Sequence, residues 1–522
     1  MYNQIGYQKY KKIQQVGVNH LTFYRRENMT EEKIESIEKI EKKEKRYVGV
    51  KETVLYGVAN GGQCIGYNMM TAQRSFFLVS VFGVPEAVVA LMLTVMSFWD
   101  AFNDPLMGVV VDKTRTRFGK LRPYLIFVPI FLGITTMLFF GGPLIVGDDA
   151  SRPIRIIYMC ITYFIWEFFY TIGDIPFWGL SSAISPNPED RSRVIKSARL
   201  ISGIIGGIPG IIITVCLDLS RNGTIPLSLS QVFFVLSVVA GTFGMYLFSL
   251  AGTKTKERVV YVNDEPKLSE CFAFMFKNKP LLLIMSSNLI SVLGGIGGTF
   301  SVYYYYNVLG VNSLSLIAGL PGTLTGWITY PLMTRLEKKW TSRQIVVRMS
   351  LMNAAVTTLV FLLGFKHYDN ISVVMPLFMI QGVFSSINGS IQAVIPTKMI
   401  SETVDYMEYK TGKRNEGMAF SVLTFMGKLT GTLATALGTA LIPVVGLVRD
   451  SASEMMVISE SSPIDTKFWL WALVTIIPAV LGLLNLIPYK FYDLEGEKLA
   501  MIQSEVQLRR QEASAKKIKE DA

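Results

Sequence analysis

The chain has 522 residues, with 51 basic and 40 acidic side chains and a net charge of +11. Half of the residues are hydrophobic and 17% are charged, whereas soluble domains carry about 25% charged residues. The mean hydropathy is +0.37, and apolar residues gather in runs of about 20, the length that a helix needs to cross a bilayer. This composition excludes a single soluble enzyme and predicts an all-α polytopic membrane protein.

The cysteines and histidines offer little material for redox or metal chemistry. Cys64, Cys160, Cys216 and Cys271 lack paired or metal-like spacing, so we interpret them as packing residues. The sequence also lacks a recognisable combination of nucleophile, base and metal ligands. We therefore expect neither an enzyme nor a protein with a resident metal or cofactor, and we expect no nucleic-acid partner.

The elements begin with an extension, residues 1–52, that is too polar to span a membrane and lacks the apolar core of a signal peptide. Charges alternate around isoleucines at 31–46, which is typical of a surface-lying helix or, as we prefer, of a solvated tail. Twelve spans are predicted near residues 54–82, 85–111, 122–146, 155–181, 195–217, 229–252, 279–308, 313–334, 345–366, 371–396, 416–446 and 466–490.

Basic residues mark every second loop. They are Lys113, Arg115, Arg117, Lys120 and Arg122, then Arg191, Arg193 and Lys196, then Lys254, Lys256 and Arg258, then Arg335, Lys338, Lys339 and Arg343, then Lys410, Lys413 and Arg414. Short loops of this kind stay in the cytoplasm, so we place both termini there and the chain in the plasma (inner) membrane. We divide the chain into an extension (1–52), a six-helix half (53–253), a central loop (254–278), a second six-helix half (279–490) and a tail (491–522).

Charged residues inside the spans are candidates for function, because burying them in a bilayer is costly. Asp100 and Asp104 in the second span lie four residues apart and share one helical face. Two such carboxylates repel each other unless a cation lies between them or one is protonated. The pair predicts a cation site, and pairing with basic residues of neighbouring helices is the alternative.

The fourth span carries a narrow polar stripe. Glu167, Thr171, Asp174 and Trp178 lie at offsets 0, 4, 7 and 11. Carboxylate and hydroxyl oxygens suit sodium, while a desolvated carboxylate can carry a proton, so both coupling ions stay open. Pro176 is expected to break the helical hydrogen bonding just beyond Asp174.

The first span carries a second stripe, formed by Asn60, Gln63, Tyr67 and Arg74. Such side chains suit a hydroxyl-rich ligand, and polar contacts between packed helices are an equal alternative. Arg74 either pairs with a carboxylate such as Glu167 or receives an anionic group, and we favour the pairing.

Two further cations and one glycine-rich span complete the polar inventory. Arg199 lies near the inner end of the fifth span and Lys428 lies well inside the eleventh. We interpret the glycines of the seventh span as close packing in preference to a gating hinge, and its tyrosines as an interfacial belt. These residues are Gly294, Gly295, Gly297 and Gly298, and Tyr303 to Tyr306.

Three segments closely resemble the signature of the glycoside-pentoside-hexuronide:cation symporters, a family of the major facilitator superfamily. They are WDAFNDPLMG at 99–108 with DKTRTRFGKLRP at 112–123, YTIGDIPFW at 170–178, and VDYMEYK at 404–410, which we place in the loop before the eleventh span. The resemblance covers about residues 56–489. It implies the major facilitator fold, with twelve helices in two halves and a site between them.

The resemblance also implies roles for individual residues. It implies a cation site of Asp100, Asp104, Asp174 and Thr171, and it places Asp174, Trp178, Arg199 and Lys428 against the substrate with Trp166 nearby. The loop that holds Asp112, Arg115, Arg117, Lys120 and Arg122 is expected to stabilise one side of an alternating cycle. The implied activity is symport of a sugar with Na+ or H+, by a monomer in membrane lipid.

Two departures from the family's sequence pattern put a melibiose-like substrate in doubt. The family's melibiose permease has an aspartate where this chain has Cys64 and an arginine where it has Ser97. Gln63, Tyr67 and Arg74 are the candidate substitutes in the sugar site. Together with Arg199 and Lys428 they would tolerate a carboxylated sugar such as a hexuronide. The alternatives are a non-sugar or amphiphilic substrate on the same fold, an uncoupled carrier, or a membrane sensor that binds without transport.

Overall fold

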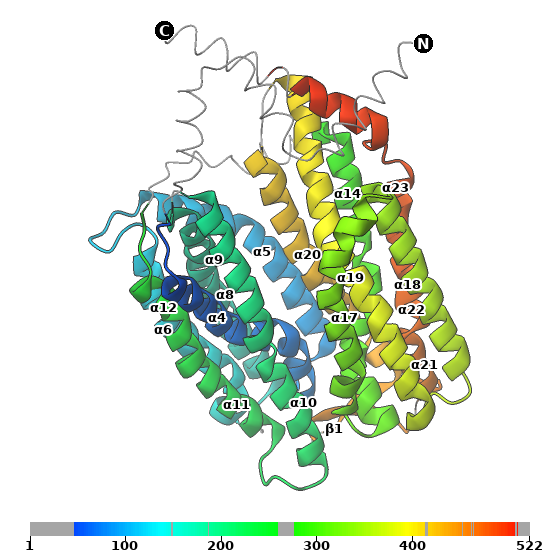
Figure 1. Cartoon of the computed structure of the whole chain (residues 1–522). Helices are drawn as coiled ribbons and strands as arrows, with labels where there is room; N and C mark the ends of the chain where they lie inside the picture. The colour runs from blue at the N-terminus through cyan, green and yellow to red at the C-terminus, as the bar shows by residue number, and fades with distance from the viewer. Residues whose placement is uncertain are drawn as a thin grey trace, which may run out of the picture.

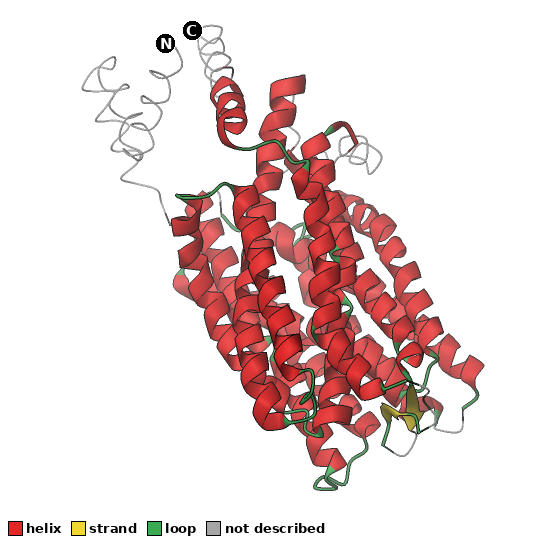
Figure 2. Ribbon diagram, turned by 90° about the vertical axis from the view of Figure 1, so that its right-hand side faces the viewer, coloured by secondary structure: helices red, strands yellow, loops and turns green. Residues whose placement is uncertain are grey.

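The computed structural model describes residues 46–506 except 148–149, 186, 259–275, 413–415, 451–452, 461 and 463, and it also describes Arg509. The predicted tail at 1–45 lies outside these residues. The described chain is a bundle of long helices with one short antiparallel strand pair (Figures 1 and 2).

The first group of helices, blue to green in Figure 1, comes from the first half of the chain. Its elements are α4 (Val50–Phe76), η1 (Phe77–Val81), α5 (Glu86–Lys113), α6 (Arg122–Phe140), α7 (Gly142–Val146), α8 (Arg152–Ala183), α9 (Pro188–Ile205), α10 (Ile208–Arg221), α11 (Leu229–Val239), η2 (Ala240–Gly244) and α12 (Met245–Lys254).

The second group, green to red in Figure 1, comes from the second half. Its elements are α14 (Lys279–Ile290), α15 (Val292–Gly295), α16 (Gly297–Tyr304), η3 (Tyr305–Leu309), α17 (Leu314–Glu337), α18 (Ser342–Gly364), α19 (Ile371–Thr411), α20 (Glu416–Leu441), η4 (Pro443–Val445), β1 (Leu447–Asp450), β2 (Met455–Ile458), α21 (Thr466–Val474), α22 (Ile476–Leu483), η5 (Leu484–Leu486) and α23 (Ile487–Lys490).

Each of the twelve predicted spans coincides with one of these helices or with consecutive ones. Within the described residues, eight helices are long and apolar enough to cross a membrane, and a pair bent by 43° at Thr466–Val474 and Ile476–Lys490 makes a ninth. The spans at α4, α5 and α17 are not in this set. Among the described residues, α5 contributes the shorter apolar stretch Glu86–Trp99 and α17 the shorter apolar stretch Leu314–Thr329.

The two ends of the bundle differ. The hairpin end carries β1 and β2, and the tail end carries the start of α4 and the helical residues 496–506 (Figures 1 and 2). At the tail end, Asp190 accepts hydrogen bonds from the backbone amides of Tyr47, at 2.8 Å, and Val48, at 3.1 Å. Arg193 lies 3.3 Å from the same carboxylate. This buried carboxylate fixes the position at which the chain enters α4.

Helix α19 corrects one expectation from the sequence. It has 41 residues, ends at Thr411 and is capped by Gly412, whose φ is +70°. At 1.5 Å per residue it is about 60 Å long, twice the hydrocarbon thickness of a bilayer. The segment 404–410 therefore lies on the last turns of this helix and not in a loop.

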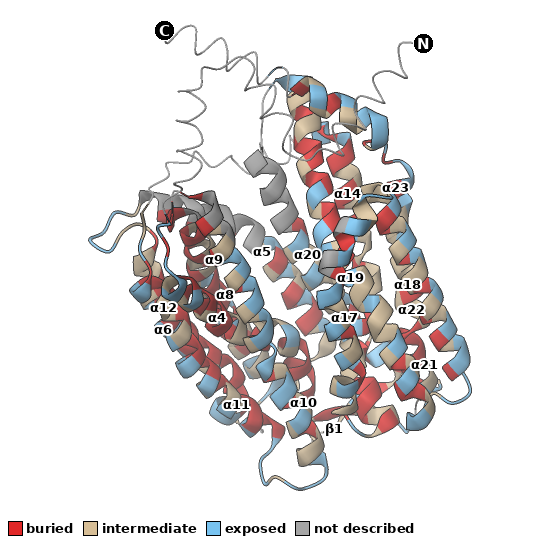
Figure 3. Cartoon of the chain, viewed as in Figure 1, coloured by how far each residue is buried: buried red, intermediate tan, exposed pale blue. Residues whose placement is uncertain are grey.

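The helices approach closely where glycines face each other. A methyl group added to Gly133 on α6 would overlap the carbonyl oxygen of Gly241 in η2, and one added to Gly62 on α4 would overlap the carbonyl oxygen of Gly244. These contacts bring α4 and α6 against the sixth span. Figure 3 shows that the residues between the helices are buried while the outward faces of the bundle are exposed, as expected for helices whose outer faces meet lipid.

Candidate functional site

The polar stripes of α4 and α8 meet at Asp174. The side-chain amide of Gln63 donates to Asp174 Oδ1 at 2.7 Å, and the hydroxyl of Tyr170 lies 3.3 Å from the same oxygen. Gln63 is buried, and its Oε1 has no hydrogen-bond partner. The structure thus brings together two predicted site residues from spans that are far apart in sequence.

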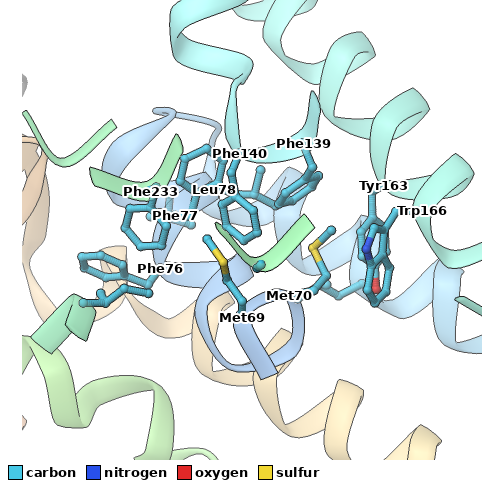
Figure 4. Close-up of a cluster of buried hydrophobic side chains, with 14 of the residues drawn as sticks. Met69, Met70, Phe76, Phe77, Leu78, Phe139, Phe140, Tyr163, Trp166 and Phe233 are labelled. Carbon is cyan, nitrogen blue, oxygen red and sulfur yellow. The ribbon is translucent and has the colours of Figure 1, made fainter. Parts of the chain in front are cut away.

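An aromatic ladder runs along α8 from this point. The ring of Tyr67 stacks on Tyr170 at 4.9 Å between centroids, Tyr170 stacks on Trp166 at 5.1 Å, and Trp166 stacks on Tyr163 at 6.3 Å. Figure 4 shows Tyr163 and Trp166 side by side at the edge of the buried cluster. Tyr67 is 36% exposed, so it forms the open end of the ladder.

Trp166 holds the aromatic ladder against α6. It is buried, and its indole nitrogen donates to Thr136 at 3.0 Å. Tyr163 and Tyr170 were not predicted as site residues. Their spacing from Trp166 and Asp174, three or four residues along α8, is the signal that places them on the same face.

Thr171 and Asn60 have different surroundings. Thr171 is 1% exposed, and its hydroxyl has no hydrogen-bond partner. Asn60 donates to the carbonyl oxygen of Ala198 at 3.2 Å. Asn60 therefore joins α4 to α9, which is the packing alternative, while Thr171 keeps an oxygen available one turn before Asp174. Helix α8 continues through Pro176, although proline has no backbone N–H and cannot make its helical hydrogen bond.

The predicted cations lie around the same region. The guanidinium carbon of Arg199 lies 4.5 Å from the centre of the Trp178 ring, a cation–π contact. Lys428 projects from α20 of the second group. Tyr67 lies where α4 meets α8, because its ring stacks on that of Tyr170.

The favoured pairing of Arg74 with Glu167 is wrong. Both side chains are buried, at 5% and 8% exposed, but no ion pair joins them among the described residues. Arg74 donates instead to the hydroxyl of Tyr163. Its Nε has no hydrogen-bond partner.

The side chains of Asp100, Asp104 and Asp112 lie outside the described part of the structure, although their backbones belong to α5. Between the first two, Asn103 is buried and its side-chain nitrogen has no partner. The described residues contain no group of three histidine, cysteine, aspartate or glutamate side chains placed to hold a metal ion.

The basic loop after α5 is held by a carboxylate from the end of the sixth span. Glu257 accepts from the backbone amides of Lys120, Leu121 and Arg122 at 2.8 to 2.9 Å, at the start of α6, where unpaired amides favour an anion. Arg122 donates to the carbonyl oxygen of Gly252 at 2.8 Å. Arg115 and Arg117 are exposed. The described contacts of this loop thus tie it to its own half.

The two halves are hydrogen-bonded to each other at the hairpin end. Asp218, at the end of α10, accepts from the backbone amides of Asn312, at 2.6 Å, and Ser313, at 2.7 Å, beside the start of α17. Arg221 donates to the carbonyl oxygen of Tyr306 at 2.6 Å and lies over its ring. Asp218 and Arg221, both from the first half, therefore bind backbone groups of the second half.

The hairpin makes the reciprocal contacts. Arg449 on β1 donates to the carbonyl oxygens of Ser80 and Val81 in η1, both at 2.7 Å. Glu454, at the turn between the strands, accepts from the amide and hydroxyl of Ser230 at 2.7 and 2.9 Å. We call these four charged residues, Asp218, Arg221, Arg449 and Glu454, the outer clasp.

The seventh span corrects one interpretation and confirms another. Tyr303 to Tyr306 are buried, not interfacial, and Tyr303 bonds to Ser80 of the first half at 3.2 Å. The reason is that α16 and η3 point these rings toward the neighbouring helices. Close packing is confirmed for three of the four glycines, since a methyl group on Gly294, Gly295 or Gly297 would lie within 3.2 Å of a neighbouring helix, while one on Gly298 would meet nothing within 4 Å.

Comparison with known proteins gives the family of the chain. The sequence model of the family described as MFS/sugar transport protein matches residues 55–496. The uncharacterized symporter YnaJ of Bacillus subtilis is 28% identical over 86% of this chain and 93% of its own length. The isoprimeverose transporter of Lactiplantibacillus pentosus is 24% identical over 87% and 92%.

Solved structures of low sequence identity share the fold. A crystal structure of the nucleoside transporter NupG matches with a TM-score of 0.54 at 11% identity, and the match covers 84% of this chain and 98% of that one. Relatives and fold neighbours are membrane transporters and not enzymes.

Proposed function

Because this chain belongs to the MFS/sugar transport protein family, a family of multi-pass membrane transporters, we propose that it is a symporter that couples uptake of a sugar or glycoside to Na+ or H+. The observation that carries the proposal is the convergence of Gln63, Asp174 and the partly exposed Tyr67 where α4 and α8 meet. The name of the isoprimeverose transporter supports a sugar as substrate.

The proposed cation site is formed by Asp174 and Thr171, with Asp100 and Asp104 from α5. The buried Thr171 hydroxyl, which has no protein partner, supports this assignment, because a hard cation binds carboxylate and hydroxyl oxygens. If the coupling ion is a proton, one of these carboxylates carries it. Gln63 links this cation site to the sugar site by its bond to Asp174.

The proposed sugar site is formed by Gln63, Tyr67, Trp178, Arg199 and Lys428. Aromatic faces pack against the apolar side of a sugar ring, and the amide and cationic groups bind its hydroxyls. Trp166 and Asn60 have structural roles in this proposal, because one supports the aromatic ladder and the other joins two helices.

Alternating access is the proposed mechanism. We place the tail end in the cytoplasm because the basic loops lie there, which puts the outer clasp on the external side of the plasma membrane. The clasp then holds the external end closed, and opening it would expose the site to the outside. The halves at 53–253 and 279–490 would rock about the site, and the functional unit would be a monomer surrounded by lipid.

The test is uptake of labelled glycosides, pentosides and sugar acids into vesicles, with an inward sodium gradient or an inward proton gradient. Stimulation of one sugar by one gradient supports the proposal and names the ion. Asp174→Asn is expected to abolish the stimulation while the protein still reaches the membrane. Uptake of no sugar under either gradient would refute it.

A further inference from the structure

One face of α18 changes from apolar to polar at the tail end of the bundle. Leu351, Leu359 and Leu362 are 50 to 60% exposed, and the exposed Gln344 and Arg348 continue the same face toward the start of the helix. Helix α18 packs on α19 and α22, and it lies at the edge of the second group of helices (Figure 1). The three leucines therefore face lipid, and Arg348 lies where the hydrocarbon layer ends.

Arg348 is held against an aromatic ring. Its guanidinium carbon lies 4.6 Å from the centre of the Trp340 ring, a cation–π contact. Trp340 is half-buried, and its backbone amide donates to the carbonyl oxygen of Leu336 at 2.9 Å. The next residue, Thr341, is the N-cap of α18 and forms a capping box with Gln344. The backbone on both sides of the ring is therefore fixed, and the ring in turn limits where the Arg348 side chain can lie.

The turn between α17 and α18 adds two more cations. Lys338 and Lys339 are exposed and directly precede Trp340 in the chain. Glu337, the acidic residue of this turn, accepts a hydrogen bond from Lys398 of α19 at 2.8 Å, so its negative charge is already offset. Positive charge thus gathers beside the exposed leucines of α18, at the depth where lipid headgroups lie.

We propose that Lys338, Lys339 and Arg348 bind the phosphate of an anionic lipid, whose acyl chains lie along the exposed leucines of α18. The lipid belongs to the leaflet at the tail end of the bundle. A guanidinium presents paired N–H donors to two phosphate oxygens, and the two ammonium groups add charge at the same place. The apolar face beside the cations commits the site to a lipid and not to a free phosphate ion. The inference concerns a partner in the bilayer, so it holds for any transported substrate and any coupling ion.

A general attraction of basic residues to an anionic membrane predicts a different behaviour. Each cation near the surface then contributes a similar amount, about fivefold in affinity, and lysine replaces arginine without loss. A built site depends instead on the guanidinium of Arg348 and on the Trp340 ring beneath it. Lys254, an exposed cation at the end of α12 in the first half, supplies the matched control.

The experiment measures which lipid lies against α18. A fluorophore is attached at Leu351→Cys, in the full chain with its native cysteines replaced, and the protein is reconstituted into vesicles that contain brominated phosphatidylglycerol or brominated phosphatidylcholine. Bromine quenches only a fluorophore that it contacts, so the ratio of quenching gives the preference for the anionic lipid at this position. Quenching by brominated phosphatidylcholine also verifies that each variant is inserted in the bilayer.

The wild-type protein is expected to prefer phosphatidylglycerol by about tenfold at this position. Arg348→Gln should lower the preference by about fivefold, the effect of one interfacial cation. Arg348→Lys and Trp340→Leu should lower it as well, because each removes part of the fixed guanidinium site. Lys254→Gln should leave it unchanged.

Four results would overturn the proposal. The first is equal quenching by the two lipids in the wild-type protein. The second is an equal loss of preference in Lys254→Gln and Arg348→Gln, and the third is a full preference in Arg348→Lys, because both describe general attraction to the membrane surface. The fourth is loss of the preference when inorganic phosphate is added at constant ionic strength, which would assign the cations to a free anion.

Discussion

Replacing Arg449 by alanine should open the hairpin end. Arg449 makes two hydrogen bonds of 2.7 Å to carbonyl oxygens of η1 in the opposite half. Hydrogen bonds to charged groups contribute about 1.5 to 3 kcal/mol each. The side chain is half-buried, and water would satisfy it in the open state, so we expect a net loss of about 2 kcal/mol from the closed state, which is about a thirtyfold population shift.

Cysteine labelling measures this shift. Ser75 is buried, and its hydroxyl bonds to Thr439 across the two halves. A single cysteine at this position, in a chain whose four native cysteines are replaced, should react with an impermeant maleimide from the hairpin side about thirty times faster after Arg449→Ala. Lys467→Ala, which removes an exposed cation from the same end, is the control and should leave the rate unchanged. Equal labelling rates in Arg449→Ala and Lys467→Ala would refute the claim that the outer clasp keeps the hairpin end closed.

Three further changes test the packing and the tail end. Gly133→Ala should lower the midpoint of thermal unfolding, because the added methyl group overlaps the Gly241 carbonyl oxygen. Overpacking of this kind costs about 1 to 3 kcal/mol. An unchanged midpoint would contradict the close contact between these two glycines. Glu257→Gln should speed tryptic cleavage of the basic loop, because a neutral amide accepts three backbone amides less strongly than a carboxylate does, and equal cleavage would count against that role. Burial raises the pKa of Asp190, but its hydrogen bonds from the two backbone amides before α4 and from Ser185 hold that pKa below its ordinary value. The stabilisation by Asp190 is therefore present above about pH 4 and is lost as the pH falls through the lowered pKa. Asp190→Asn should make the free energy of unfolding depend less on pH in the acid range. An equal pH dependence in the variant and the wild-type protein would show that the carboxylate does not act this way.

The helical spans could be predicted from the sequence because their signal is local. Runs of apolar residues bounded by basic loops locate helices without knowledge of their neighbours. The end of α19 was missed because its last turns are polar. That extension is held by contacts outside any bilayer, including packing of Met407 in one cluster with Ile502 from the C-terminal segment, and such tertiary contacts are not visible in hydropathy.

The site was predictable where residues of one helix share a face. The stripes that contain Gln63 and Asp174 follow from spacing alone, and the structure adds that they are bonded to each other. The role of Asn60 could not be predicted, because a side-chain amide inside a span suits a ligand or a neighbouring helix equally well. The clasp could not be predicted either, since its charged side chains bind backbone groups that carry no sequence signature.

Cation-driven accumulation tests the central claim most directly. The purified chain in proteoliposomes would be given a labelled sugar at equal concentration on both sides and an inward gradient of Na+ or H+ as the only driving force. We predict that the sugar concentrates inside, that an ionophore for that ion abolishes the gain, and that Asp174→Asn equilibrates the sugar without concentrating it. Equilibration without accumulation by the wild-type protein under both gradients would contradict coupled symport.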